Sequence, residues 1–433
     1  MSIIIIIIAI TICTFSYIIE RKVYSPVFLF TAFIGCISFL ASLRLYNTIE
    51  ISNKTYIVII FGIIGFAIGG IFCYQLRFTH RDYKIDSNNT IAFNSLVLPS
   101  NELVLRSKMF SIITMCLMSF SAMRLYSVIG LLRSGYSLDY IRMVYFGTEV
   151  QGVNVSHFTG IIETYINLPC LYGFMPIIIL EIFKSKDKRN IGLLTITSYG
   201  IWFFLSSLVS GGRLTIYIFA IELLFYWQMV KKRKKTNRRT KILLVVLYAT
   251  FFYFMYYMSV NRSGTGTYDF ISSLYVYFSG AVAHMSTRLS NFDFEWTYGL
   301  TLISGLLRPL MLVVKYLLGT WPNIYQNTID IGVKLQFPVS INSLKDFNAF
   351  VLPFFYFYCD GGILMVLFDS LVYGAVCESF YLNFKHKKTE FSTVLYLLII
   401  SGLMCSMVRY NFILVYYTLA FFVVWFIYKK KKS

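Results

Sequence analysis

Apolar runs of roughly 18 residues or more recur along the whole sequence, and this pattern assigns the chain to the membrane-spanning proteins. Only 14% of its 433 residues are charged, whereas soluble domains carry about 25%. The runs are continuously apolar and do not alternate with period two, as the strands of a membrane β-barrel do. The predicted fold class is therefore an all-α polytopic membrane protein.

Eleven apolar segments are expected to span the membrane. They are roughly residues 2–19, 25–42, 55–74, 108–132, 165–183, 191–209, 214–230, 242–260, 349–380, 393–407 and 412–428. Two further apolar segments, 270–285 and 300–318, span as a pair and give about 13 spans, or lie in the membrane interface and leave about 11. Gly305 and Pro309 in the second segment favour a broken or interfacial helix.

Basic joints between the runs predict the orientation. Four are dense in Lys and Arg, namely 184–189, 231–241, 385–388 and 429–432, and the positive-inside rule places them in the cytoplasm. An even number of expected spans separates each joint from the next, so the four assignments agree. The N-terminus is then outside and the C-terminus inside. Residues 1–433 form a single membrane domain with two large extracytoplasmic loops, 133–163 and 261–347.

The net charge of +19 is explained by this orientation, and no nucleic-acid partner is expected. The eight cysteines lie in or beside apolar runs without metal-ligand spacing, which is typical of packing residues. The chain has no phosphate-binding glycine loop, no HExxH, no CxxC and no GxSxG. We therefore expect neither a metal nor a cofactor.

Arginines are frequent on the predicted exterior side, against the positive-inside trend. They are Arg44, Arg133, Arg142, Arg213, Arg262, Arg288, Arg308 and Arg409. A planar guanidinium suits bidentate recognition of phosphate, so this set points to a phosphate-bearing lipid or a pyrophosphate-linked substrate. The alternative for each arginine alone is that it snorkels to headgroups or pairs locally.

The predicted exterior turn Ser210-Gly211-Gly212-Arg213 combines two features of anion sites. Its glycines let backbone amides approach an anion, and Arg213 begins the next helix, where the dipole is positive. A plain tight turn, with glycine for positive φ, is the structural alternative.

Within 261–347, His284 and Arg288 are four residues apart and share one face of a continuing helix. Glu295 follows Asp293 closely. An imidazole or a carboxylate here would accept a proton from an attacking hydroxyl; capping and solvated loop charge are the alternatives.

Three charged residues fall inside expected spans: Arg124, Asp360 and Asp369. Charge within the membrane suggests function. Asp360-Gly361-Gly362 predicts a helix break, which either makes Asp360 reachable from outside or forms a kink that carries a satisfied carboxylate.

Three motifs resemble the oligosaccharide repeat unit polymerases, the Wzy-type O-antigen and capsular polysaccharide polymerases. They are Ser210-Gly211-Gly212-Arg213 before a span, Tyr298-Gly299-Leu300 leading to Leu307-Arg308-Pro309, and the run from Phe355 to Gly362. A glycine eleven positions after an arginine, as at Arg288 and Gly299 or Arg308 and Gly319, also resembles a pattern of that family. The similarity covers roughly residues 120–425.

That resemblance implies a membrane-embedded glycosyltransferase of GT-C-like architecture in the bacterial inner membrane. Its substrate would be a glycan linked to undecaprenyl pyrophosphate, with membrane lipids and a chain-length regulator as partners. The resemblance, together with the arginines, assigns pyrophosphate binding to Arg213 and Arg288, supported by Arg142, Arg308 and Arg409. His284 or Glu295 is the expected base.

Other functions fit a polytopic chain with exterior loops. An O-antigen ligase shares the architecture and uses a different acceptor. A flippase or secondary transporter predicts short loops and internal repeats, and a scaffold protein has no need of exterior arginines. The long interval 261–347 and the absence of a repeat favour the polymerase over the transporter.

Overall fold

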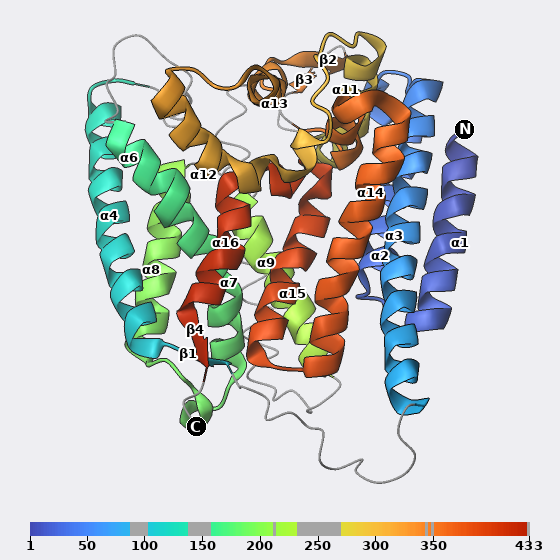
Figure 1. Ribbon diagram of the computed structural model, residues 1–433. Coiled ribbons are helices and arrows are strands. Elements are labelled where there is room, and N and C mark those ends of the chain that lie inside the picture. The colour runs from blue at the N-terminus through green and yellow to red at the C-terminus, as the bar shows by residue number, and fades with distance from the viewer. Residues whose placement is uncertain are drawn as a thin grey trace. The chain divides into compact units, whose positions relative to one another are not determined.

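The computed structural model describes residues 1–86, 103–136, 157–210, 214–231, 270–342, 345–347 and 350–430 (Figure 1). It is mostly helical and divides into two compact units. Unit 1 comprises Met1–Pro99, Arg262–Lys388 and Ile399–Val415, and unit 2 comprises Ser100–Asn261, Thr389–Leu398 and Tyr416–Ser433.

Unit 1 contains most of the N-terminal helices and the long interval after residue 261. Its elements are α1 (Ser2–Glu20), α2 (Pro26–Ser42), a short 3-10 turn (Leu45–Asn47), α3 (Asn53–Asp86), α11 (Phe270–Ser290), α12 (Leu300–Leu318), α13 (Asn323–Lys334), β2 (Val339–Asn342), β3 (Lys345–Phe347), α14 (Pro353–Lys387), the end of α15 (Glu390–Met404) and two 3-10 turns (Cys405–Met407 and Asn411–Ile413). Strands β2 and β3 pair antiparallel, with Val339 opposite Phe347.

Unit 2 is a second helical group closed by a two-stranded ribbon. Its elements are β1 (Leu103–Leu105), α4 (Ser107–Arg133), α6 (His157–Ile162), a π-helical turn (Glu163–Asn167), α7 (Leu168–Phe183), a 3-10 turn (Lys186–Lys188), α8 (Leu193–Ser210), α9 (Leu214–Lys231), the start of α15, α16 (Val415–Ile427) from Tyr416 onward, and β4 (Tyr428–Lys430). Strand β1 pairs antiparallel with β4, Leu103 opposite Lys430.

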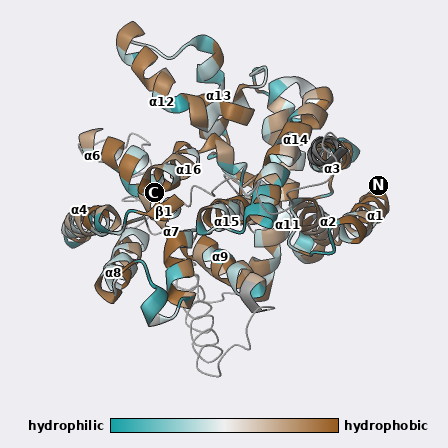
Figure 2. Ribbon diagram, turned by 60° about the horizontal axis from the view of Figure 1, so that its bottom comes forward, coloured by the Kyte–Doolittle hydropathy of each residue, from teal (hydrophilic) through white to brown (hydrophobic). Residues whose placement is uncertain are grey.

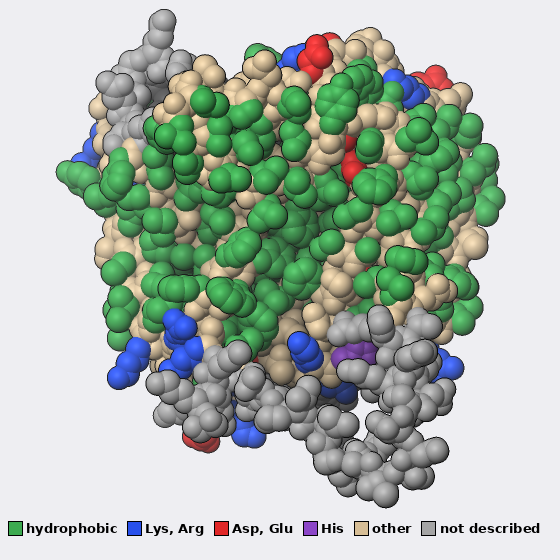
Figure 3. All heavy atoms as spheres, in the orientation of Figure 1, with side chains coloured by type: hydrophobic (Ala, Val, Ile, Leu, Met, Phe, Trp, Pro, Cys, Tyr) green, Lys and Arg blue, Asp and Glu red, His purple; other side chains and the backbone are tan. Residues whose placement is uncertain are grey.

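Seven helices among the described residues are long and apolar enough to cross a membrane. They are Ser2–Glu20, Asn53–Leu76, Ser107–Arg133, Phe158–Phe183, Leu300–Leu318, Pro353–Lys387 and Glu390–Met407. Figure 2 shows hydrophobic residues along most helices, and hydrophobic side chains cover much of the helical surface visible in Figure 3. These observations confirm the polytopic helical class. Helices occupy every expected span except 242–260, which lies outside the described residues.

The interval 261–347 has more structure than the sequence indicated. Helix α11 is not among the helices that are long and apolar enough to span a membrane, whereas α12 is. Helix α13 and the β2–β3 ribbon were not predicted. Helix α12 also runs unbroken through Gly305 and Pro309. Of the two expectations for this segment, the broken helix is therefore wrong, and the interfacial helix stays a prediction. Gly305 does have a packing role: a Cβ at this position would overlap the carbonyl oxygen of Phe412.

The core of unit 1 is the contact between α3 and α14, which depends on glycine. A Cβ on Gly65 or Gly69 of α3 would overlap backbone carbonyls of α14, and a Cβ on Gly374 of α14 would overlap the carbonyl of Phe66. Small residues let helix backbones approach closely, which is how helices associate in a lipid environment that offers little hydrophobic driving force. Phe66 stacks on Phe30 of α2, with ring centroids 4.2 Å apart.

We expect Gly69→Ala to destabilise unit 1 by about 1–3 kcal/mol, the usual cost of overpacking a core. The added methyl group overlaps the carbonyl oxygen of Leu371. The thermal unfolding midpoint in detergent measures this effect. Gly200→Ala is the control, because a Cβ at Gly200 in α8 meets no atom within 4 Å. Equal midpoints for the two variants would contradict this account of the α3–α14 contact.

Unit 2 is held by aromatic and polar contacts between helices. Phe110 of α4 stacks on Phe174 of α7 at 4.2 Å, and the indole N–H of Trp202 donates to Asn167 Oδ1 at 3.0 Å. The π-helical turn that ends at Asn167 presents Glu163 to Arg124 of α4, with nitrogen and oxygen 2.5 Å apart. Arg124, one of the three charges expected within spans, is therefore buried and paired inside unit 2.

Joints that the sequence places on one side of the membrane meet within each unit. In unit 1, Lys385 pairs with Glu20 at 2.6 Å, which joins the ends of α1 and α14. At the other end, where α3 and α14 begin, the Ile49 N–H donates to the Ile341 carbonyl at 3.0 Å and the Val351 N–H to the Val408 carbonyl at 3.2 Å. This second end, which also contains α11, α13 and the β2–β3 ribbon (Figure 1), is called the loop end below.

In unit 2, the joints near residues 184–190 and 389–391 meet each other and the β1–β4 ribbon. Lys184 pairs with Glu390 at 2.6 Å, and the ring of Phe391 lies 5.4 Å from that of Tyr428. Within each unit, these contacts join segments that the predicted topology places on the same side of the membrane. They therefore agree with the even number of spans expected between those segments.

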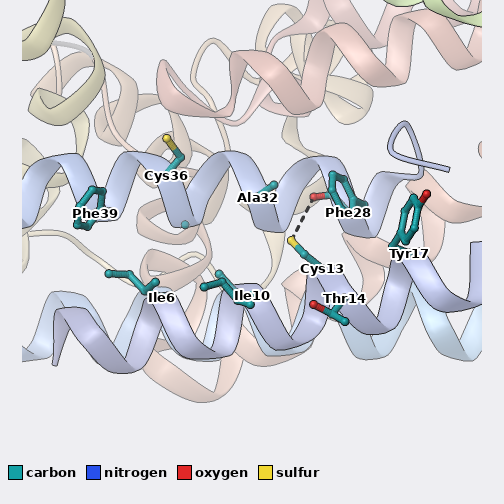
Figure 4. Close-up of a pocket in the computed structure, with 11 residues that line it drawn as sticks. Ile6, Ile10, Cys13, Thr14, Tyr17, Phe28, Ala32, Cys36 and Phe39 are labelled. Carbon is teal, nitrogen blue, oxygen red and sulfur yellow. Dashed lines mark hydrogen bonds between the residues drawn. The ribbon is translucent and has the colours of Figure 1, made fainter. Parts of the chain in front are cut away.

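An apolar crevice of about 520 Å³ lies between α1 and α2 (Figure 4). Its polar groups are few: Thr14, Tyr17 and the thiols of Cys13 and Cys36. The Cys13 thiol donates to the carbonyl of Phe28 at 3.7 Å. Since no charged side chain lines it, this crevice offers van der Waals contact and no acid–base or ionic chemistry.

Candidate functional site

A break inside α14 lies at the centre of the loop end. Gly361 (φ 158°, ψ 38°) and Gly362 (φ 76°, ψ −157°) leave helical geometry, and Asp360 directly before them is fully buried. Glycine permits the positive φ of Gly362 without a steric penalty. The predicted break at Asp360-Gly361-Gly362 is confirmed. Of its two interpretations, the structure supports a kink that carries a satisfied carboxylate.

Two threonines replace hydrogen bonds that α14 loses at the break. The Thr297 N–H donates to the Cys359 carbonyl at 3.0 Å, and its hydroxyl donates to the Asp360 carboxylate at 2.6 Å. The Thr301 hydroxyl contacts the same carboxylate and lies 3.1 Å from the Tyr356 carbonyl oxygen. Because an unpaired backbone group costs several kcal/mol in a membrane, these contacts stabilise the broken helix.

Asp360 also fixes the start of α12. Its carboxylate accepts the Thr301 backbone N–H at 3.1 Å, in the first turn of that helix, while Gly299 at the cap position has no side chain to offer. A carboxylate at this end satisfies a free N–H and the positive end of the helix dipole. The Tyr410 hydroxyl donates to the Leu302 carbonyl at 3.0 Å and adds a second attachment.

We expect Thr301→Val to loosen α12 at its attachment, because the variant keeps the side-chain shape and removes the hydroxyl that Asp360 contacts. Leaving that buried carboxylate short of a donor should cost about 1–3 kcal/mol. Hydrogen exchange of the α12 amides measures the loss of protection. Thr301→Ser retains the hydroxyl and serves as the control; equal protection in the Val and Ser variants would refute the assignment.

His284 and Arg288 share one face of α11, as their spacing predicted, and they form a hydrogen-bonded chain. His284 Nδ1 lies 2.9 Å from the Phe350 carbonyl oxygen, which can only accept, so Nδ1 carries the proton. His284 Nε2 then accepts the Nε–H of Arg288 at 3.2 Å. Arg288 Nη2 donates to the carbonyls of Lys334 at 3.0 Å and Phe337 at 2.8 Å, at the end of α13.

These hydrogen bonds keep the His284 imidazole neutral and engage both of its nitrogens. Burial, reinforced by the neighbouring charge of Arg288, lowers the pKa of His284 to about 4, although the bond to Phe350 acts in the opposite direction. Burial also lowers the pKa of Arg288 from its ordinary value. Both ring nitrogens of His284 are engaged within the protein. The structure therefore places His284 as a support of Arg288 and α13, away from solvent.

The stability of the loop end should fall as the pH falls from about 6.5, the ordinary His pKa, towards 4. In this window the unfolded chain binds a proton at His284 that the folded chain excludes, so acid favours unfolding. The full difference is at most about 3.5 kcal/mol for a pKa that falls from 6.5 to about 4, at about 1.4 kcal/mol per pKa unit.

His284→Asn is the matched control for this pH effect, because its amide can still donate to Phe350 and does not titrate. Thermal midpoints between pH 6.5 and 4 should fall more steeply in the natural chain than in the variant. Parallel curves would contradict the role given to His284.

Glu295 lies in an exposed segment between α11 and α12, next to a group of aromatic rings. Phe292, Trp296 and Tyr358 pack together with ring centroids 5.2–6.1 Å apart and are called the aromatic platform below. Glu295 is exposed and has no partner among the described residues. Asp293, also exposed, lies 3.4 Å from the ammonium of Lys334. Of the two expected bases, Glu295 is the accessible one.

Cations without carboxylate partners flank α12. Arg308 and Lys315 lie over the ring of Trp321, at 5.9 Å and 5.0 Å from its centroid. Neither forms an ion pair within the described part of the chain. The opposite face of this helix is apolar and exposed, for example at Leu310 (58%) and Leu317 (79%). Helix α12 thus combines a cationic side with an uncovered apolar side.

Arg409 is half-buried beside the start of α12. Its Nε is buried and has no hydrogen-bond partner among the described residues, and the same holds for Oδ1 of Asn411. The turn that begins at Asn411 packs against α12, where Gly305 meets the Phe412 backbone. A buried N–H without an acceptor is costly unless a ligand or water satisfies it, so Arg409 is the expected pyrophosphate residue whose surroundings best suit an anion.

The other predicted arginines are placed differently. Arg44 pairs with Glu50, and Arg288 binds backbone carbonyls. Arg142 and Arg213, two of the predicted pyrophosphate residues, lie outside the described residues, as do Arg262 and most of the first predicted loop. No group of three or more His, Cys, Asp or Glu residues within the described ranges could hold a metal ion.

Comparison with protein-family models, with curated proteins and with solved structures gives no match. The resemblance to the polysaccharide polymerases therefore rests on the motifs in the sequence.

Sequence reasoning missed several residues that build this site. Thr297 and Thr301 were not singled out, although two threonines around a Tyr-Gly turn, next to an expected helix, suggest capping. Helix α13 was missed despite a visible signal: Tyr325, Thr328, Ile331 and Leu335 are buried at helical spacing after Pro322. Lys54 lies far away in the sequence, and no local pattern indicates its contact with Tyr358 (4.9 Å from the ring centroid).

Proposed function

We propose that this protein is a glycosyltransferase that polymerises oligosaccharide repeat units linked to undecaprenyl pyrophosphate. The reaction would take place at the outer face of a bacterial inner membrane and would yield O-antigen or capsular polysaccharide. The observation that supports this most directly is that α12 combines an exposed apolar face with cations on its other side that form no ion pair in the described part of the chain. Such a lipid-linked substrate needs both surfaces, one for its prenyl chain and one for its pyrophosphate.

The cations would bind the leaving group. Arg308 lies on α12, one turn beyond the contact of Gly305 with Phe412, and Arg409, with its unsatisfied buried Nε, lies near the start of that helix. Neither has an acidic partner among the described residues. Guanidinium groups placed where negative charge develops stabilise the transition state. Arg142 and Arg213 remain part of the proposal as additional donors. Arg288 has only its Nη1 without a partner among the described residues, so it contributes mainly by holding α13.

The proposed step forms one glycosidic bond and breaks one. A hydroxyl oxygen of the acceptor attacks the anomeric carbon of the donor chain, the bond from that carbon to the pyrophosphate oxygen breaks, and undecaprenyl pyrophosphate leaves with the electron pair. The hydroxyl proton passes to a base. Glu295 suits this role better than His284, because Glu295 is exposed and both nitrogens of His284 are bonded. A free carboxylate can accept a proton directly.

Arg409→Gln and Arg308→Gln should each weaken binding of undecaprenyl pyrophosphate to the purified protein by about tenfold to a hundredfold, the effect of losing one hydrogen bond to a charged group. In cells, the same variants should shorten the surface polysaccharide, which gel electrophoresis of extracted glycan reveals. Arg44→Gln is the control at the same end, because Arg44 already pairs with Glu50.

Deleting the gene separates this proposal from its competitors. A polymerase deletion should leave single repeat units on the surface, whereas a bare surface would indicate a ligase or a flippase. Full-length polymer from stable Arg308→Gln and Arg409→Gln proteins would overturn the assignment of the site.

A further inference from the structure

We propose that the aromatic platform, together with Tyr298, binds a neutral pyranose ring of the acceptor glycan. Trp296 would be the ring against which the sugar stacks. This inference rests on the proposed function and adds to it a binding site for the second substrate, separate from the cations that flank α12.

The three rings of the platform come from two elements and support one another. Phe292 and Trp296 belong to the segment after α11, and Tyr358 belongs to α14 just before its break. Phe292 lies 5.2 Å from Trp296 at an interplanar angle of 31° and 5.3 Å from Tyr358 at 80°. Lys54 of α3 places its ammonium 4.9 Å from the Tyr358 centroid and donates to the Leu289 carbonyl at 3.0 Å.

Trp296 and Tyr358 therefore have different surroundings. The cation of Lys54 lies over Tyr358 and, at 6.0 Å, over Phe292. Trp296 is 37% exposed, and its indole lies 4.0 Å from where a Cβ of Gly362 would stand. The indole thus presents an open surface beside the exposed backbone of the α14 break, where Gly361 is also exposed.

The backbone around Trp296 is fixed on both sides. Phe294 is buried against Phe355 at 5.2 Å, and Thr297 is bonded to α14 through its N–H and its hydroxyl. Tyr298, the next residue, has φ 51° and is 70% exposed. A tyrosine at positive φ is strained, and strain that the structure tolerates often marks a functional position. Here the strained turn holds a large aromatic side chain at the surface of the protein.

The polar groups beside the rings suit a sugar. A pyranose presents C–H groups on one face, which contact the negative face of an aromatic ring, and hydroxyls at its edge. Asp293 and Glu295 precede Trp296 in the sequence and are exposed, so their oxygens can accept hydrogen bonds from sugar hydroxyls. Lys334 balances Asp293, and Lys54 over the platform offsets the charge of Glu295, which has no ion-pair partner among the described residues. The platform therefore carries no net charge to attract a charged sugar and suits a neutral one.

Exposed Trp and Tyr residues also form belts at membrane interfaces, and that is the competing role for Trp296 and Tyr298. The two adjacent carboxylates argue against it, because acidic groups are repelled by anionic headgroups. The backing of the indole by Phe292 and the anchoring of the segment to α14 also fix one ring orientation, which a belt residue does not need.

The test uses the full chain in lipid nanodiscs and saturation-transfer NMR with four neutral disaccharides: lactose, maltose, cellobiose and diacetylchitobiose. We expect saturation to reach the ring C–H protons of at least one of them. Trp296→Ala should weaken the binding by about tenfold, the effect of losing one aromatic contact. Trp296→Phe, which keeps a ring, should retain more of the signal than Trp296→Ala.

Trp425→Ala is the matched control. Trp425 on α16 is 69% exposed and does not belong to the platform. The Trp425→Ala substitution should therefore leave disaccharide binding unchanged. No transfer to any of the four sugars, or equal transfer in the Trp296→Ala and natural proteins, would overturn the platform assignment. An equal loss in both tryptophan variants would indicate an interfacial belt.

Titration of the same nanodiscs with undecaprenyl pyrophosphate separates this inference from the proposed function. Binding of the lipid that depends on Arg308 and Arg409 but not on Trp296, without any sugar binding, would remove the platform and leave the proposed function intact. Sugar binding at Trp296 without lipid pyrophosphate binding would keep a saccharide site and remove the polymerase.

Discussion

The Asp360 carboxylate holds the loop end together. It accepts the Thr297 hydroxyl and the Thr301 backbone N–H, and it contacts the Thr301 hydroxyl, so one buried group joins the interrupted α14 to the first turn of α12. A carboxylate in a membrane protein is tolerable only when its oxygens are satisfied. The direction in which α12 leaves α14, and with it the placement of Arg308 and Trp296, depends on this joint.

The break itself is tolerated because the rest of α14 is firmly packed. Beyond the two glycines, α14 lies against α3 with backbones in contact at Gly69 and Gly374. Dispersion between closely approaching backbones, rather than exclusion of water, stabilises such a pair in lipid. A helix that is fixed along its length can bend at one point without separating from its partner. The glycines of α3 therefore support the loop end even though they lie outside it.

Hydropathy predicted the helices well, because the membrane demands long apolar segments whatever they contact. The break in α14 was also predictable, since Gly361 and Gly362 are adjacent and follow Asp360. The pairing of polar groups was not predictable: His284 bonds Phe350, and Arg288 bonds carbonyls 46 and 49 residues away in the sequence. Hydrogen bonds between such distant residues leave no periodic pattern. For Arg213 and Arg142, which lie outside the described residues, the sequence remains the only guide.

The predicted exterior arginines differ in the hydrogen-bond and ion-pair partners that the structure gives them. The sequence offers no way to rank these arginines, and their number on the predicted exterior side suggested that they bind an anion. Arg44 has a carboxylate and Arg288 has carbonyls and an imidazole, so an incoming phosphate would have to displace bonds already made. Arg308 and Arg409 lack acidic partners in the described chain, and the Nε of Arg409 is buried without an acceptor. A ligand anion gains most where the protein has left donors unsatisfied. This is why we propose the anion site beside α12, next to an apolar face that the prenyl chain of the proposed substrate would cover.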